Sequence, residues 1–478
     1  MNRASLLPLL ALTGLAGCSL APEYQRPAMT LPATFKEAPG WTSAAPADDV
    51  AKGEWWKLFG DRDLDALEAR VAISNQNVAA YAAAYRQAQA AVRESRAGLF
   101  PSLDLNGSAS RSESFDGGTT GIVPGGSGGT ATLSRGTTSS LALGATWQPD
   151  LWGRVGNATR QAGAAAQASA GDLRNATLAA QGELASDYFQ LRGIDAQAAL
   201  LAETSAAYDR SLTITRNRFR EGIVSQADVF QAETQLRNAR AQQADLARQR
   251  AIYEHAIAVL VGANPSRFSI APAAWDRTVP QVPAVLPGAI VQRRPDVAAA
   301  ERRVAAANAA IGVQRAAFFP TLSLSGSAQT NGGALGSLFS APASLWSLGT
   351  SAAQTIFDGG ARSARVREAL AAYEQAAAAY RQAVLTAFQQ TEDGLAAVRV
   401  LATVADERGA AATAAVQAQA IAMNQYLAGQ TDYTVVVTAQ TTALSARQAE
   451  VEAVTNRQVA TVSLIQAIGG GWGVLRPQ

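Results

Sequence analysis

The chain has 478 residues, 48% of them hydrophobic and 16% charged, and its 40 Lys and Arg side chains nearly balance 38 Asp and Glu. No segment concentrates basic residues into the positively charged face that nucleic-acid binding requires, which excludes that class of function. One His (His255) and one Cys (Cys18) are too few for a zinc site, and no paired catalytic residues stand out, so we expect no enzyme, no metal and no cofactor.

Residues 1–17 have the features of a secretory signal peptide, in which Arg3 precedes a short apolar run at 6–12. The run is too short to span a bilayer. The sequence Leu-Ala-Gly-Cys at 15–18 resembles the bacterial lipoprotein box, which implies lipidation of Cys18; the alternative is a chance cysteine after a signal peptide. Ser19, in place of an Asp, favours the outer membrane over the inner one.

The rest of the chain repeats itself. Residues 75–108 align with 294–327 at an offset of 219, with 14 identities in 34 positions, and a second block pairs Gly222 with Gly429 at an offset of 207. Two such copies indicate one structural unit used twice. The predicted domains are a signal peptide at 1–17, a lipid-anchored N-terminal segment at 18–63 that wraps a belt region, a first repeat at 64–286, a second repeat at 287–470 and a tail at 471–478.

Each repeat is predicted to contain a helix, a β-hairpin, a long helix, a turn and a further helix. The first helices are expected at 64–98 and 295–317, and the hairpins at 101–148 and 320–357. Within the hairpins Leu103 and Leu105 alternate with polar residues, and the strands are about ten residues long, as tilted membrane strands are.

The long helices are expected at 155–219 and 361–427, each a rod of roughly 98 Å. A long coiled coil would explain these helices equally well. The strands favour another structure. Four strands cannot close a membrane barrel, whose smallest members have eight, and an open edge cannot face lipid. Several chains must therefore pool their strands, and the assembly encloses a tube.

The turns between the helices carry their own signals. Gly222 ends the first long helix, and Ser225 with Asp228 resembles a capping box for the next helix. Gly429 and Asp432 are expected to do the same in the second repeat. The alternative is that both turns are ordinary helix ends without a partner.

Several motifs together resemble a known family. They are Gln-Arg-Arg-Pro-Asp-Val at 292–297, Ala-Phe-Phe-Pro-Thr-Leu-Ser-Leu at 317–324, Ala-Pro-x-Tyr-x-Arg-Pro at 21–27, Trp-Trp-x-Leu-Phe at 55–59, Asp-Leu-Trp-Gly-Arg at 150–154 and Phe-Asp-Gly-Gly at 357–360. In this order they are similar to the signature of outer-membrane efflux lipoproteins of the TolC superfamily, the outer-membrane factors of NodT and OprM type.

The resemblance implies an α+β membrane protein: a homotrimer with a twelve-stranded outer-membrane β-barrel, four strands per chain, continuous with a long periplasmic α-helical barrel. It also implies a passive exit duct for drugs and other toxic small molecules, which confers multidrug resistance. The implied partners are a periplasmic adaptor protein, an inner-membrane pump of the resistance-nodulation-division type and outer-membrane lipid. Trp55 and Trp56 would pack near the belt.

The resemblance further implies roles for residues at the periplasmic tip. Gly222, Ser225, Asp228, Gly429 and Asp432 would lie where the adaptor docks. Tyr433 and Thr438 would lie at the pore constriction. Many members carry an Asp where Thr438 stands, so we expect no charged ring there.

Two other functions remain open. A duct for type I protein secretion would share the architecture and differ in its inner-membrane partner. A periplasmic coiled-coil scaffold without a pore would require the alternating segments to lie outside the membrane.

Overall fold

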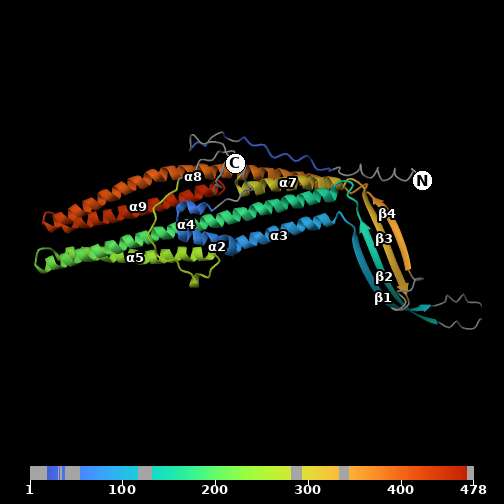
Figure 1. Ribbon diagram of the computed structural model, residues 1–478, viewed down its shortest axis with the longest axis horizontal. Coiled ribbons are helices and arrows are strands. Elements are labelled where there is room, and N and C mark those ends of the chain that lie inside the picture. The colour runs from blue at the N-terminus through green and yellow to red at the C-terminus, as the bar shows by residue number, and fades with distance from the viewer. Residues whose placement is uncertain are drawn as a thin grey trace, which may run out of the picture. The chain divides into compact units, whose positions relative to one another are not determined.

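The computed structural model describes residues 19–30, 32, 35–37, 54–116, 132–280, 293–332 and 344–470. Figure 1 shows the helices and strands that these residues form. The first half of the chain contains η3 (Trp55–Phe59), α2 (Arg62–Ser74), α3 (Gln76–Ala97), β1 (Ser102–Asp116), β2 (Thr132–Trp147), α4 (Arg154–Arg220), α5 (Gln226–Leu260) and η4 (Pro265–Arg267). The second half contains α7 (Pro295–Ala316), β3 (Thr321–Gly332), β4 (Ser344–Ala353), α8 (Ala361–Leu427) and α9 (Tyr433–Ala467).

The chain divides into two compact units. Unit 1 comprises residues 1–25, 88–166 and 304–376, and unit 2 comprises residues 26–87, 167–303 and 377–478. Each unit therefore draws on both of the predicted repeats, 64–286 and 287–470. The physical reason is that β2 pairs with β3, and α4 packs closely against α9.

Unit 1 contains an antiparallel sheet with the strand order β1-β2-β3-β4. The register places Leu105 opposite Leu143, Leu143 opposite Ala328, and Ala328 opposite Trp346. Among the described strands, β1 and β4 each have a neighbour on one side only, so the sheet is open at two edges.

The two long helices, α4 and α8, have 67 residues each, which corresponds to roughly 100 Å. Their positions confirm the helices expected at 155–219 and 361–427. Both are rich in Ala, the strongest helix former. A glycine with positive φ lies just before and just after each helix and marks its two ends. None of the described helices combines the length and the apolar composition needed to cross a bilayer.

The single helix predicted at 64–98 is wrong, because the structure divides it at Asn75 into α2 and α3. Asn75 is extended, and its side-chain oxygen accepts from the backbone N–H groups of Asn77 and Val78 at 2.9 and 3.0 Å. It thus starts a new helix. Its Nδ2 donates to the carbonyl of Leu260, at the end of α5, at 2.8 Å.

The second half of the chain has an equivalent joint. Arg294 lies 219 residues after Asn75, which is the offset of the sequence repeat. Its Nη1 donates to the carbonyl of Ala467, at the end of α9, at 2.9 Å, and its guanidinium also binds Asp296 in the first turn of α7. In each half, therefore, one polar residue joins the end of the last helix to the start of an earlier one.

Three glycines let α4 approach its neighbours in unit 2. Gly171, Gly182 and Gly193 are spaced by eleven residues, close to three helical turns, so they lie on one side of α4. A Cβ added at Gly171 would stand 2.9 Å from the Cβ of Ala299, and one at Gly193 would stand 2.5 Å from Thr455 Oγ1. These positions bring α7 and α9 into close contact with α4.

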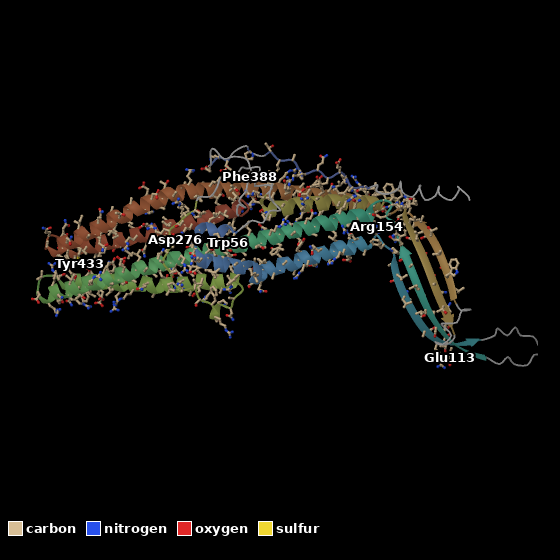
Figure 2. The ribbon with its side chains drawn as sticks, viewed as in Figure 1. Trp56, Glu113, Arg154, Asp276, Phe388 and Tyr433 are labelled. Carbon is tan, nitrogen blue, oxygen red and sulfur yellow. The ribbon has the colours of Figure 1, made fainter. Side chains whose placement is uncertain are left out.

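The tryptophan pair predicted to pack near a belt lies in the main apolar core of unit 2. Trp55 and Trp56 are buried, with their rings edge to face at 5.9 Å. They pack with apolar residues of α2, α4 and α5, and Figure 2 labels Trp56. Farther along unit 2, the backbone N–H groups of Lys36 and Glu37 donate to the carboxylate of Glu392 on α8, which fixes this part of the N-terminal segment.

Candidate functional site

The four-stranded sheet has one apolar and one polar face. Because side chains alternate along a strand, the register fixes which residues share a face. The apolar face carries Leu103, Leu105, Leu141, Leu143, Ala145, Trp147, Leu322, Leu324, Ala328, Trp346 and Leu348. Trp346 and Leu348 are 79% and 80% exposed within the single chain, so this face has no cover of its own. The alternation predicted from the sequence is confirmed.

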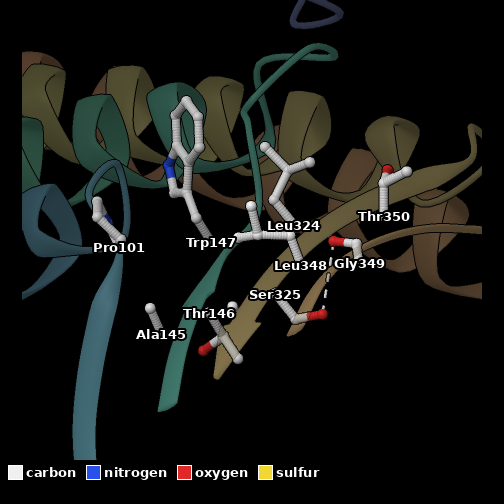
Figure 3. Close-up of a pocket in the computed structure, with 10 residues that line it drawn as sticks. Pro101, Ala145, Thr146, Trp147, Leu324, Ser325, Leu348, Gly349 and Thr350 are labelled. Carbon is white, nitrogen blue, oxygen red and sulfur yellow. Dashed lines mark hydrogen bonds between the residues drawn. The ribbon is translucent and has the colours of Figure 1, made fainter. Parts of the chain in front are cut away.

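Part of the apolar face is hollowed into a shallow pocket of about 470 Å³ (Figure 3). Trp147, Leu324 and Leu348 line it, and they come from three different strands. A hollow between such side chains suits an acyl chain better than a polar molecule.

The opposite face is rich in serine. Hydroxyl pairs join neighbouring strands, with Ser108 to Ser140 at 2.8 Å and Ser327 to Ser347 at 2.9 Å. Leu345 is an exception on this face, because it lies opposite Gln329. A polar face of this kind suits contact with water.

Both strand-to-helix junctions of unit 1 are fixed by an aspartate. Asp150 accepts from the N–H groups of Val155 and Gly156 at 3.0 and 2.6 Å, at the start of α4. At the start of α8, Asp358 accepts from the backbone N–H and from Nε of Arg362 at 3.1 and 2.7 Å. The hydrogen bond from the guanidinium lowers the pKa of the Asp358 carboxyl. The sequence motifs at 150–154 and 357–360 thus start the long helices.

Cys18, the predicted lipidation site, and the signal peptide lie outside the described residues. The residues that follow Cys18 are held within unit 1. Ser19 Oγ donates to Asn157 Oδ1 on α4 at 2.9 Å, and Asn308 Nδ2 on α7 donates to the carbonyl of Pro22 at 2.8 Å. The chain after Cys18 is therefore attached to the first turn of α4, close along the chain to β2.

The turn between α4 and α5 has the geometry expected from its sequence. Gly222 has φ +75°, and the N–H of Ile223 donates to the carbonyl of Arg218 at 2.9 Å, which closes the helix end. Ser225 and Asp228 form a reciprocal capping box, with backbone-to-side-chain distances of 3.0 and 3.3 Å. A Cβ on Gly222 would meet no atom of this chain within 4 Å.

The turn between α8 and α9 shares the glycine but not the capping box. Gly429 has φ +74°, and the N–H of Gln430 donates to the carbonyl of Gln425 at 2.9 Å. The expectation that Asp432 caps α9 as Ser225 caps α5 is wrong, because its side chain makes no capping hydrogen bond. The third helical position holds Val435, which cannot complete the reciprocal pair.

The two residues predicted at a constriction have different surroundings. Tyr433 is buried in unit 2, its ring centroid 5.1 Å from that of Tyr426, and burial raises the pKa of its hydroxyl to about 12. It therefore acts within the packing between helices. Thr438 is exposed, and its hydroxyl donates to the carbonyl of Thr434 in its own helix at 2.9 Å.

Sequence reasoning missed a contact between the two turns. Arg218 Nη1 donates to the carbonyl of Tyr426 at 2.8 Å, and its guanidinium lies 4.6 Å from the centroid of that ring. The sequence held one clue to this contact: Arg218 lies four residues before Gly222, and Tyr426 lies three residues before Gly429. The two turns also differ in charge. Asp432 is the one charged residue between Arg408 and Arg447, whereas Arg218, Arg220, Glu221 and Asp228 surround the first turn.

Within the described residues no group of three or more His, Cys, Asp or Glu side chains could hold a metal ion. The candidate site is a set of surfaces and turns: the two-faced sheet, the strand-to-helix junctions and the two helix turns.

Comparison with known proteins agrees with this architecture. The sequence profile of the Outer membrane efflux protein family matches residues 69–263 and 286–470. The toluene efflux pump outer membrane protein TtgC of Pseudomonas putida is 31% identical over 465 residues, covering 96% of this chain and 93% of TtgC. The cation efflux system protein CusC of Escherichia coli is 29% identical over 477 residues, covering 99% and 100%. The solved structure of the outer-membrane channel OprN superposes with a TM-score of 0.84 at 26% identity, covering 95% of this chain and all of that one.

A sheet with one exposed apolar face, joined by capped junctions to very long helices, defines an outer-membrane channel protein. The chain belongs to the outer membrane efflux protein family. It is an efflux protein of the outer membrane that extends into the periplasm.

Proposed function

We propose that this chain is one of three identical subunits that together form a passive exit duct for small molecules across the outer membrane. It performs no chemistry of its own. The duct receives its cargo from an inner-membrane pump of the resistance-nodulation-division type through a periplasmic adaptor protein.

The open sheet carries the proposal. Four strands with free edges at β1 and β4 cannot face lipid, because their unpaired N–H and C=O groups would have no partners there. Pairing β4 of one copy with β1 of the next removes every edge. Three copies supply twelve strands, within the range of known membrane barrels.

The two faces of the sheet support the same assembly. With the apolar face outward, Trp346 and Leu348 meet acyl chains, and the serine-rich face lines the water-filled interior. Side chains of this kind make few specific contacts with a passing molecule, so selectivity belongs to the pump.

Cys18 is proposed as the lipid-bearing residue. The hydrogen bond of Ser19 to Asn157 holds the neighbouring residue beside the start of α4, where the strands end. Globomycin, which blocks lipoprotein signal cleavage, should leave a lipid-modified precursor that still carries its signal peptide, whereas Cys18→Ala should leave a precursor without lipid.

The nature of the cargo is inferred from the relatives. The names of TtgC and CusC assign toluene and cations to the systems in which those proteins act. Such different cargoes fit a duct that does not select. A duct for type I protein secretion is the second candidate, since it would need the same closed tube.

Deletion of the gene separates these two candidates. We expect drug and solvent susceptibility to rise while the yield of secreted proteins stays unchanged, and complementation with the intact gene should restore resistance. Loss of a secreted protein without any change in susceptibility would favour the secretion duct.

The two turn glycines are proposed to let the adaptor approach the helix ends closely. Both Gly222 and Gly429 face open space within the chain, so a larger side chain there alters the outer surface and strains a positive φ. The double change Gly222→Leu and Gly429→Leu should abolish drug export while detergent-resistant oligomers still form. Full export by that variant would rule out docking at these turns.

A further inference from the structure

The chain that follows α5 crosses from one helical hairpin of unit 2 to the other. We call residues 268–280 the strap. Figure 1 shows this segment leaving α5 and reaching the hairpin of α8 and α9, and Figure 2 labels Asp276 within it.

The first end of the strap is fixed to α4 and α5 by buried charges. Arg192, only 3% exposed, donates to the carbonyl of Ala271 at 2.8 Å and also binds Asp195. Glu254 accepts from the N–H of Ile270 at 2.5 Å. A buried arginine that satisfies a backbone carbonyl in this way is costly to displace.

The second end of the strap is fixed to α9. Gln458 is 1% exposed, and its Nε2 donates to the carbonyls of Asp276 and Thr278 at 2.8 and 3.1 Å. Trp275 Nε1 donates to Gln458 Oε1 at 3.3 Å. The Trp275 ring packs on Ala405 of α8 and on two residues of α9, so it reaches both helices of the second hairpin.

Only Pro272, Ala273 and Ala274 separate the two anchors, and all three are exposed. Four Cα steps span at most about 14 Å, and the proline restricts the residue before it to extended conformations. The anchors therefore cannot move apart by more than this short spacer allows.

The strap also spans a point where the two hairpins touch. Gly193 of α4 lies against Thr455 of α9. Gly193 follows Arg192 directly in the sequence, and Thr455 lies three residues before Gln458. The helices α4 and α9 also meet at Gly182 and Gln466 and at Tyr208 and Gln440. The strap adds a further link between the two hairpins at the level of Gly193 and Thr455, and this link resists their separation.

We propose that the strap is a tether that couples the α4–α5 hairpin to the α8–α9 hairpin and so limits how far the end of the duct opens at rest. The proposal rests on the proposed function, because only a duct has an opening to limit. The strap and the two residues that anchor it, Arg192 and Gln458, belong to the same chain.

Two variants test the tether in the full-length protein, reconstituted into planar bilayers. In the first, a four-residue Gly-Ser insertion between Ala273 and Ala274 lengthens the spacer and leaves both anchors intact. In the second, Gln458→Leu keeps a similar volume and removes the α9 anchor. We expect both to raise the resting conductance about two-fold or more, because small changes at a constriction control passage.

Two matched controls accompany them. The same insertion after Pro280 lies outside the spacer, and Arg447→Ala removes the exposed Arg447–Glu203 ion pair that also joins α9 to α4. Both should conduct as the unaltered protein does. Unaltered conductance in the spacer-insertion variant would overturn the tether, whatever Gln458→Leu does. An absence of conductance in the unaltered protein would instead contradict the proposed duct.

Discussion

At the scale of single residues, Glu68 places an ionisable side chain in a fully buried position. It is 0% exposed in the apolar core of unit 2, and neither carboxyl oxygen has a hydrogen-bond partner. Burial raises its pKa from 4.5 to about 9. The folded protein therefore keeps a proton that the unfolded chain releases above its ordinary pKa.

This difference predicts a pH dependence of stability. Between about pH 4.5 and 9 the folded state binds one more proton than the unfolded state, so the free energy of unfolding falls as pH rises, by at most about 1.4 kcal/mol per pH unit. Glu68→Gln should remove this slope. Thermal unfolding followed by circular dichroism at pH 5, 7 and 9 measures it, with exposed Glu94→Gln as the control. Equal slopes in the unaltered protein and Glu68→Gln would contradict the prediction.

Thr438 leads to a second prediction at this scale. Its hydroxyl is bonded to its own helix, and the surrounding sequence from 409 to 446 carries a single charge, on Asp432. Thr438→Ala should change conductance little and independently of salt, whereas Thr438→Asp should add a cation preference that weakens at high salt. Bilayer recordings at low and high salt distinguish them. A large, salt-dependent effect of Thr438→Ala would show that the neutral residue controls the ion path.

At the scale of elements, the close approach of α4 to α9 can be tested at one glycine. A Cβ at position 193 would stand 2.5 Å from Thr455 Oγ1, and that hydroxyl is held by a 2.9 Å bond to the carbonyl of Val451. Gly193→Ala should therefore destabilise the folded protein by about 1–3 kcal/mol. Gly163→Ala, in the same helix with no atom within 4 Å, should be neutral or stabilising by up to about 1 kcal/mol. Equal melting temperatures for the two variants would argue against this contact.

The elements also show what the sequence can and cannot predict. The long helices were predictable because glycine and aspartate mark their ends and Ala fills them. The break at Asn75 was missed because its cause is distant: the residue caps α3 while it binds the end of α5, 185 residues away. The repeat offset contained the clue, since Asn75 and Arg294 occupy equivalent places, but their different side chains hid the shared role.

The candidate site divides in the same way. The two-faced sheet followed from alternation, and Gly222, Ser225 and Asp228 followed from local turn chemistry. Asp432 failed because a cap needs a suitable partner three residues on, and Val435 is not one. Arg218, Arg192 and Gln458 escaped notice because their partners come from other elements, which periodicity does not reveal.

At the scale of the whole molecule, the open edges of β1 and β4 determine the account. Only pairing with further copies can satisfy these edges in lipid, and a closed ring of two-faced strands is hollow. Single-channel recording of the purified mature protein in a planar lipid bilayer tests this most directly. The account predicts discrete, long-lived conductance steps from detergent-resistant oligomers. A protein that stays monomeric and leaves the bilayer at its protein-free conductance would contradict it.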